Sequence, residues 1–546
     1  MAGRGRCSRA ATNPRRNGTI QETVETVSSG NIVTSETPEA PWLSIISTHS
    51  PDSEPATALQ DSLREQTSDS WELLLTGPGA TVRTTPWTSE RLGSAEGERR
   101  GEDVCSDLAS LFNSACEVAR GQFVVFANSA AVLSPDTVRQ LKDAVATAPT
   151  ADIVYTDEVK QGREVRKPVF SPERLRSHAY FGNLTAYRRE LVTSIGGMRD
   201  LPGAEHYDLS LRASGAARRV EHLSQLLYRS NEPSPPMDAP ALASVEKALA
   251  DHLSRTGGGH VDQVLPNGFH RTRRSVAGRP LVSIIIPTRG DSATVHASSR
   301  CLVVEAVRSV IERTDYDNYE IVVVIDDVAP ASVAADLQSL AGDRLRLVPW
   351  SDPFSFSGKM NLGVLHSRGD FLLLLNDDVE VISSNWLSSM LALGQRPNAG
   401  LVGAMLYFED DTIQHAGHAY YRLDVTHIGL YSHRGALGPN GAFAIEREVD
   451  GVTAACALMP RDVYFTVGGF TSLLPGNFND VDLCMKVSAC GFDIYWTPYA
   501  ELYHFESKSR NPKVAPYELD KAWGRWQHHF WNSDHWPENP HQIYTR

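Results

Sequence analysis

The residues best suited to chemistry stand together at the end of a short apolar run. Residues 371–381 read FLLLLNDDVEV, so five apolar residues lead directly into Asn376, Asp377 and Asp378. Such a run indicates a strand buried on both faces of a parallel sheet, whose ligands bind beyond the carboxyl ends of the strands. Two adjacent carboxylates there could hold a hard cation, with phosphate oxygens completing its shell. The alternative is an ordinary turn, because Asn and Asp are common turn residues.

Three further polar clusters follow in the same part of the chain. Pro287, Thr288 and Arg289 end the strand-like LVSIIIPTR, Asp326 and Asp327 end EIVVVIDD, and Lys359 lies in SGKMN. One of the two aspartates could accept a hydrogen bond from the N3–H of uracil or thymine, and the lysine could meet a phosphate. Each cluster alone is a weak signal. Together they predict one ligand-binding rim, because the carboxyl ends of parallel strands share one edge of a sheet.

A second set of candidates lies nearer the carboxyl end. In GNFNDVD, Asp480 and Asp482 precede an apolar pattern typical of a helix. A carboxylate at a helix start is often a cap, which is the role expected for Asp482, whereas Asp480 is the candidate for chemistry. His504 follows the strand-like IYWTPYAELY, and Lys508 and Arg510 come just after it. A lone His is usually structural, but this one could complete a metal site while the two cations clamp a diphosphate.

Strands and helices alternate around these candidates, which predicts an α/β fold. Segments of the first half match segments of the second in the same order, for example ARGQFVVFANSAAVLS with SRGDFLLLLNDDVEVIS, which predicts two tandem copies of one fold. The expected organisation is a disordered tail (1–40), a first copy (41–235), a linker with a helix (236–279), a second copy (280–510) and an aromatic-rich extension (511–546).

Bulk composition excludes several classes of protein. The 546 residues are 41% hydrophobic and 22% charged, and the formal net charge of -14 disfavours a nucleic-acid partner. The seven cysteines form no CxxC pair, which favours reduced thiols in the cytoplasm and argues against a zinc site. No apolar run reaches the roughly 20 residues of a membrane span. The arginine-rich start lacks the apolar core of a secretory signal, so weak contact of a basic tail with a membrane is the lesser alternative.

The second half resembles the family 2 glycosyltransferases of GT-A fold, most closely the bacterial branch that builds O-antigen, rhamnan and other surface polysaccharides. The motifs that carry this resemblance are SIIIPTR, LLLLNDDVEV, TIQHAGH, GGF, FNDVDLC and WTPYAELYHFESKSR. The first half resembles the degenerate amino-terminal domain that often precedes such enzymes, and VEKALADHLSR resembles the helical linker between the two. The implied fold is two tandem GT-A domains, each Rossmann-like with a mostly parallel sheet.

The resemblance also implies roles for single positions. Asp378 would be the main ligand of Mg²⁺ or Mn²⁺ with His504 as a second ligand, Asp480 would be the catalytic base, and Asp326 or Asp327 would hold the nucleotide base. The implied nucleotide-sugar set is Pro287, Thr288, Arg289, Asp326, Asp327, Lys359, Asn376, Asp377, Lys508 and Arg510, and the acceptor set is Gln414, His415, Thr453 and Asp482. The chain departs from the family pattern at Asn376, the first DxD position, and at Asn479, where many relatives have Glu.

The expected reaction is an inverting, metal-dependent transfer of rhamnose or a similar sugar from a dTDP- or UDP-linked donor. The acceptor would be a growing surface or cell-wall glycan, or a lipid-linked glycan, at the inner face of the membrane. The oligomeric state stays open. In the first half, Ser129, Ala130, His206 and Arg229 align with Asp377, Asp378, Asp480 and His504, which predicts no sugar transfer there.

Two other functions are alternatives to sugar transfer. A non-catalytic glycan- or nucleotide-binding scaffold fits the first half alone. A sugar nucleotidyltransferase would need a Gly-rich phosphate loop after its first strand, which SIIIPTRGDSAT does not supply.

Overall fold

The computed structural model describes residues 40–48, 57–77, 80–84, 107–231, 237–265, 267–422, 424–505 and 514–544. The chain divides into two units, Met1–Ala40 and Pro41–Arg546, and everything below concerns the second. The expected tail and the pair Lys508 and Arg510 lie outside the described residues, apart from Ala40. No helix in the described ranges is both long enough and apolar enough to span a bilayer.

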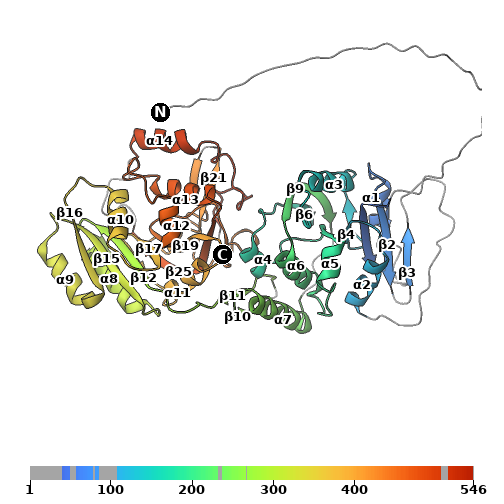
Figure 1. The fold of residues 1–546 in the computed structure, drawn as a ribbon, viewed down its shortest axis with the longest axis horizontal. Helices are drawn as coiled ribbons and strands as arrows, with labels where there is room; N and C mark the ends of the chain where they lie inside the picture. The colour runs from blue at the N-terminus through green and yellow to red at the C-terminus, as the bar shows by residue number, and fades with distance from the viewer. Residues whose placement is uncertain are drawn as a thin grey trace, which may run out of the picture. The chain divides into compact units, whose positions relative to one another are not determined.

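A ten-stranded mixed sheet occupies the second half of the chain (Figure 1). Its main path runs β16-β15-β12-β17-β24-β19-β25-β18. The strands are β12 (Val282–Thr288), β15 (Tyr319–Asp326), β16 (Leu345–Trp350), β17 (Phe371–Leu375), β18 (Val379–Val381), β19 (Ala399–Tyr407), β24 (Cys456–Pro460) and β25 (Asp493–His504), with β20 (Ile413–His415) on β19 and β23 (Arg447–Glu448) on β25. The strands β16, β15, β12 and β17 run parallel, and β24 runs antiparallel to β17 and β19. The sheet is therefore mixed, and its parallel run extends from the edge strand β16 to β17.

Helices cover both faces of this sheet because alternate residues of each central strand point to opposite sides. Ile284 and Ile286 of β12 pack on one side with α8 (Leu302–Arg313), α9 (Ala331–Ala341) and α11 (Trp386–Gly394). Ile285 packs on the other side with α10 (Phe356–Leu365), α12 (Arg461–Thr466) and α13 (Asn479–Ala489). The residues of β17 after Phe371 are fully buried, which confirms the strand predicted from the apolar run.

A nine-stranded sheet occupies the first half. Its main path runs β3-β2-β1-β4-β8-β6-β9-β5, and β7 pairs with β6. The strands are β1 (Leu43–Thr48), β2 (Trp71–Gly77), β3 (Ala80–Thr84), β4 (Phe123–Phe126), β5 (Val132–Leu133), β6 (Ile153–Lys160), β7 (Arg163–Val165), β8 (Thr185–Arg188) and β9 (Val220–Ser230). From β2 onward this order matches the path that starts at β15, position by position. The strand β3 runs antiparallel to β2, whereas β16 runs parallel to β15.

Strand pairing corrects one position of the alignment between the halves. Arg229 of β9 pairs with Val132 of β5, whereas His504 of β25 pairs with Val379 of β18. Counted from the shared Phe of the two matching segments, Val132 corresponds to the residue after Val379. In an antiparallel pair, Arg229 therefore corresponds to the residue before His504. Ser230 takes the place that the sequence alignment gave to Arg229.

The helix predicted near residues 241–255 is α7 (Ala239–Arg255). Its N-cap is Asp238, whose side chain accepts a hydrogen bond from the Ala241 N–H, and this satisfies one of the first free amides of the helix. Val245 and Leu249 are buried in the same core as Leu209 of α6 (Glu205–Ala216). The antiparallel pair β10 (Gly259–Gln263) and β11 (Arg271–Arg274) follows.

Buried charges link α4 (Pro172–Ser177) to the strand β23. The Arg176 guanidinium pairs with Glu173 at 2.8 Å and with Glu446 at 2.6 Å. Glu448 accepts a hydrogen bond from the Glu173 N–H at 2.9 Å. Burial, reinforced by the charge of Glu173, raises the pKa of Glu448 to about 8. This carboxyl is therefore protonated at neutral pH inside an otherwise ionised cluster.

We expect Glu448→Gln to stabilise the chain, and to do so more strongly as pH rises. The folded pKa of Glu448 lies above its unfolded value of about 4.3, so the free energy of unfolding falls between the two values by up to about 1.4 kcal/mol per pH unit. Gln cannot ionise and still offers an oxygen to the Glu173 N–H. Urea unfolding of both proteins at about pH 5 and about pH 8 measures the difference. An equal difference at both pH values would contradict the buried titration.

Candidate active site

A cavity of about 290 Å³ opens at the carboxyl ends of β12 and β17. It brings together residues that lie far apart in the sequence. The predicted residues in its wall are Pro287, Thr288, Arg289, Asn376, Asp377, Asp378, Gln414, Thr453, Asp480 and His504. Asp326, Asp327, Lys359, His415 and Asp482 are not in the wall. The rim predicted from strand ends is thus present, although some predicted members stand behind it.

The turn after β17 meets the end of β25 because β18 pairs with β25. Val379 lies opposite His504, so Asp378, one residue earlier, comes within reach of the imidazole. The distance from Asp378 Oδ1 to His504 Nε2 is 3.2 Å, and Asn376 Nδ2 lies 3.1 Å from the same nitrogen. A carboxylate, an amide and an imidazole therefore converge at one point of the cavity wall.

The Gln414 side chain orients the His504 ring. Its Nε2 donates to the His504 carbonyl at 3.3 Å, and its Oε1 lies 2.7 Å from His504 Nδ1. Because Oε1 can only accept, Nδ1 carries a proton, and in the neutral ring Nε2 therefore presents a lone pair toward Asp378. A neutral imidazole held by a second side chain in this way is the form in which histidine binds metals. A divalent cation could therefore bind between the lone pair of His504 Nε2 and the carboxylate of Asp378.

Asp377 lies next to the carboxylate of Asp378 and is bound by a threonine hydroxyl. It accepts a hydrogen bond from Thr288 Oγ1 at 2.6 Å. Burial, followed by the neighbouring charge of Asp378, raises the pKa of Asp377 to about 7. Two adjacent carboxylates removed from water repel one another, and a divalent cation bound beside them would offset that repulsion. The donor set therefore fits Mg²⁺ or Mn²⁺.

Lys359 lies behind the rim, and its position differs from the phosphate contact that the sequence predicted. Its ammonium is fully buried, pairs with Asp326 and donates to the Thr288 carbonyl at 2.8 Å. An ammonium held in this way positions Asp326 and the end of β12 and does not face the cavity, so the phosphate contact expected for Lys359 is not what this geometry provides. Asp327 is exposed and accepts a hydrogen bond from Ser351 at 2.5 Å.

The two acidic residues at the start of α13 differ in their surroundings. Asp480 lies in the first turn and lines the cavity. Asp482 is buried, pairs with Arg525 at 2.7 Å and with Lys486 at 3.1 Å, and accepts a hydrogen bond from Trp526 Nε1 at 2.9 Å. The N-cap of α13 is Phe478, with no side-chain cap bond, so the cap role expected for Asp482 is wrong. Its carboxylate faces the carboxyl-terminal extension, which also corrects its expected acceptor role.

Sequence reasoning missed the part that the carboxyl-terminal extension plays. The helix α14 (Pro516–Trp526) supplies Arg525 and Trp526, which bind Asp482. Glu518 accepts hydrogen bonds from the Gly476 and Asn477 N–H groups at 2.9 Å and 2.8 Å. This helix therefore braces the segment that carries Asp480 on both sides of that residue. The sequence pattern contained no signal for these pairings, because aromatic density alone does not name a partner.

Two further cavity residues, His418 and His427, were also missed. His418 belongs to the TIQHAGH segment and could have been noted from it. His415, which was predicted, lies next to them: its Nε2 accepts from the Thr453 N–H at 3.2 Å and its Nδ1 lies 3.2 Å from His427 Nδ1.

Comparison with known proteins finds two relatives of this chain. The chain is 33% identical over 529 residues to an uncharacterized protein, y4gI, of Sinorhizobium fredii, covering 89% of this chain and 56% of that protein. It is 30% identical over 482 residues to the O-antigen biosynthesis protein RfbC of Myxococcus xanthus, covering 83% of this chain and 36% of that protein. The chain thus spans about half of the first relative and about a third of the second.

Solved structures with similar chains include GalNAc-T7 with UDP, GalNAc and Mn²⁺, at 15% identity and a TM-score of 0.37, covering 46% of this chain and 50% of that one. Residues 1–349 of TarS from S. aureus match at 17% identity and a TM-score of 0.31, covering 39% of this chain and 65% of that one. The family model "Glycosyl transferase family 2" matches residues 283–465, which hold β12, the turn after β17 and β24. Over these residues the chain is similar to glycosyl transferase family 2.

Proposed function

We propose that this chain is an inverting, metal-dependent glycosyltransferase that moves rhamnose or a similar sugar from a dTDP- or UDP-linked donor to a glycan hydroxyl. The observation that carries the proposal is that one cavity holds both an acidic residue, Asp480, and the Asp378–His504 pair. Asp480 fits the role of a general base. The Asp378–His504 pair fits a site for a cation that binds the diphosphate of the donor. The similarity to an O-antigen biosynthesis protein supports a surface-polysaccharide acceptor.

Each residue has a defined part in the proposed reaction. Asp480 accepts the proton of the acceptor hydroxyl while that oxygen attacks the anomeric carbon from the side opposite the diphosphate. The bond between the anomeric carbon and the diphosphate oxygen breaks, and the nucleoside diphosphate leaves. A divalent cation held by Asp378 and His504 would neutralise negative charge on the diphosphate. Thr288, Arg289 and Asp377 line the donor side, and Asp326 or Asp327 meets the nucleotide base.

We infer further that the first half is a second GT-A copy that has lost its chemistry. The matched strand order of the two sheets supports the duplication. At the metal position stands Ala130, which has no side-chain oxygen, and His206 is the second residue of its helix as Asp480 is of α13. Ser230, by strand pairing, stands where His504 stands. This half then has a structural or acceptor-holding role.

We expect variants of the first half to leave donor turnover near the parent value. The test changes Ser129, His206, Arg229 and Ser230 to Ala, one at a time and together, and measures donor turnover beside a thermal unfolding scan that checks folding. If these changes stop transfer as completely as loss of Asp378 does while the fold stays intact, the first half is a second active site.

The proposal as a whole is tested by a screen of nucleotide sugars with and without Mg²⁺ or Mn²⁺. The readouts are release of nucleoside diphosphate and protection against heat. Free nucleoside diphosphate supports a glycosyltransferase, whereas pyrophosphate would identify a sugar nucleotidyltransferase. Nucleotide binding without any turnover, with acceptor glycans supplied, would identify a binding scaffold.

A further inference from the structure

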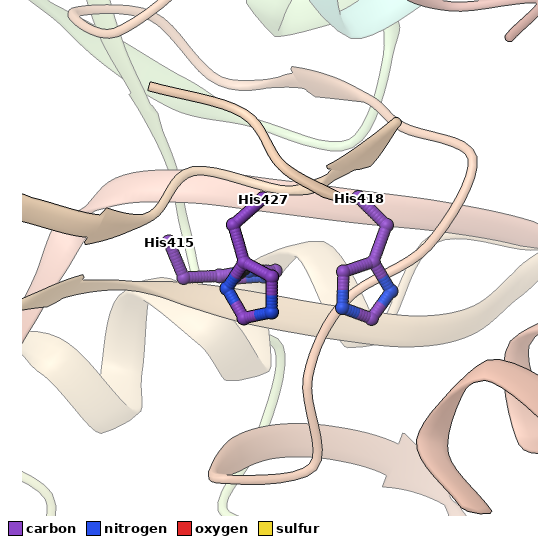
Figure 2. Close-up of side chains that lie close together, drawn as sticks. All are labelled: His415, His418 and His427. Atoms are coloured by element: carbon purple, nitrogen blue, oxygen red, sulfur yellow. Dashed lines mark hydrogen bonds between the residues drawn. The ribbon is translucent and has the colours of Figure 1, made fainter. Parts of the chain in front are cut away.

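Three histidines, two of them in the cavity wall, converge on short strands that fix their positions (Figure 2). His415 ends β20, and His418 begins β21 (His418–Tyr421). His427 ends β22 (Asp424–His427) and lies directly opposite His418 in the antiparallel β21–β22 pair. Between the first two, Gly417 has a φ of +107°, which reverses the chain within two residues and which side chains rarely allow. The backbone therefore brings the rings together before any ligand is present.

The rings have the spacing of ligands around one ion. Their centroids form a triangle with sides of 4.8, 5.1 and 5.1 Å. One nitrogen from each ring lies within 4.8 Å of the others, and the two Nδ1 atoms of His415 and His427 are 3.2 Å apart. Two nitrogens bound at 2.0–2.1 Å to a tetrahedral ion stand about 3.3 Å apart, so this pair needs almost no movement.

The environment keeps His415 and His418 neutral. Both side chains are fully or almost fully buried, and burial disfavours the charged imidazolium. Burial, followed by the neighbouring histidines, lowers the pKa of His415 well below its usual value, and burial lowers the pKa of His418 to about 3. Neutral imidazole is the form that binds metals.

We propose that His415, His418 and His427 form a second metal site, distinct from Asp378 and His504, which takes a borderline transition-metal ion such as Zn²⁺. Three imidazole nitrogens suit Zn²⁺, whereas the oxygen-rich Asp378 set suits Mg²⁺ or Mn²⁺. Three protein ligands leave one coordination position. Because His418 and His427 line the cavity, that position faces the space beside Asp480. The cysteine pattern argued against zinc, but this site uses no cysteine.

Binding has one local requirement. The Thr453 N–H points at His415 Nε2, so the neutral ring carries its proton on Nδ1 and donates it to His427 Nδ1. An ion at Nδ1 moves this proton to Nε2, and the Thr453 amide must then turn away from the ring. The 3.2 Å hydrogen bond that is lost is long, and its loss is small beside the coordination that replaces it.

The test measures Zn²⁺ binding to the full chain after treatment with a chelator, by calorimetry, without donor or acceptor. We expect the parent protein to bind one more Zn²⁺ than His427→Gln and His418→Gln, with an affinity loss above the roughly 10–100-fold that removal of an outer-shell partner costs. His427 is only half-buried, so its replacement is the milder change. The matched controls are His366→Gln, which removes an exposed imidazole elsewhere, and Asp378→Asn.

Each outcome decides the proposal. Loss of the ion in the two cluster variants and its retention in both controls supports the site. Equal binding by the parent and His427→Gln overturns it, and loss in Asp378→Asn to the same extent places the ion at the other site and also overturns it. If a cluster variant fails to fold, X-ray absorption of the parent protein with one Zn²⁺ decides instead. Three imidazole nitrogens at 2.0–2.1 Å support the proposal, and a shell dominated by oxygen contradicts it. Failure of this site leaves the glycosyltransferase proposal untouched, because the two use different ligands.

Discussion

Asp378→Ala is expected to abolish donor turnover and the metal-dependent part of nucleotide binding. The substitution removes the carboxylate that stands 3.2 Å from His504 Nε2, and with it the only anionic member of the convergence of Asn376, Asp378 and His504. A hard cation prefers carboxylate oxygen, and an amide and an imidazole alone bind it weakly. Turnover and binding of a nucleoside diphosphate are measured with Mg²⁺, with Mn²⁺ and with chelator.

The first half supplies a natural comparison for this experiment. Ala130 already stands at the corresponding place there, so Ala is compatible with the turn after the strand. Asp378→Ala should consequently fold, and a thermal unfolding scan checks this. Turnover that persists in Asp378→Ala with chelator present would show that the reaction needs no metal at this position.

Asp480→Asn is expected to slow sugar transfer by about 100-fold or more, because a positioned general base typically contributes 10²–10⁴-fold. Asn keeps the size of Asp but cannot take the proton of the acceptor hydroxyl. Donor binding should change little, since Asp378 and His504 are intact. Single-turnover rates and nucleotide affinity measured on the same preparation separate the two effects.

Asp482→Asn is the matched control, two residues further along the same helix. Its carboxylate is buried against Arg525, Lys486 and Trp526, so Asn at this position removes two ion pairs from a buried group and should lower the unfolding temperature. The rate at a temperature where both proteins are folded should fall less than in Asp480→Asn. Full activity in Asp480→Asn together with a large loss of rate in Asp482→Asn would move the base to Asp482.

Local patterns in the sequence determined the strands and the rim. The apolar run before Asn376 predicts β17 because a strand buried on both faces must be apolar at every position, and this needs no knowledge of its neighbours. The strand ends then place Pro287, Thr288, Arg289, Asp377 and Asp378 at one edge by topology alone. For the same reason, the matching segments of the two halves predicted sheets of matching order.

Only the tertiary structure showed which polar side chains form ion pairs and hydrogen bonds with one another. Lys359 was open to a phosphate in the sequence, and only the packing of α10 against the sheet shows that its ammonium is buried beside Asp326. Asp482 was a plausible cap until Arg525, 43 residues later, came to lie beside it. Such partners are set by side chains that converge from distant elements, and spacing along the chain carries no information about them.

The pairing register of the strands could not be predicted from the sequence. The strand pairing differs from the alignment of letters by one residue, so that Ser230 and not Arg229 stands at the position matching His504. A shift of one residue turns each side chain to the opposite face of a strand, so an alignment of letters cannot detect it. The three-histidine cluster has the same origin. Residues 415, 418 and 427 follow no regular spacing, and they meet because the β21–β22 pair folds His427 back onto His418.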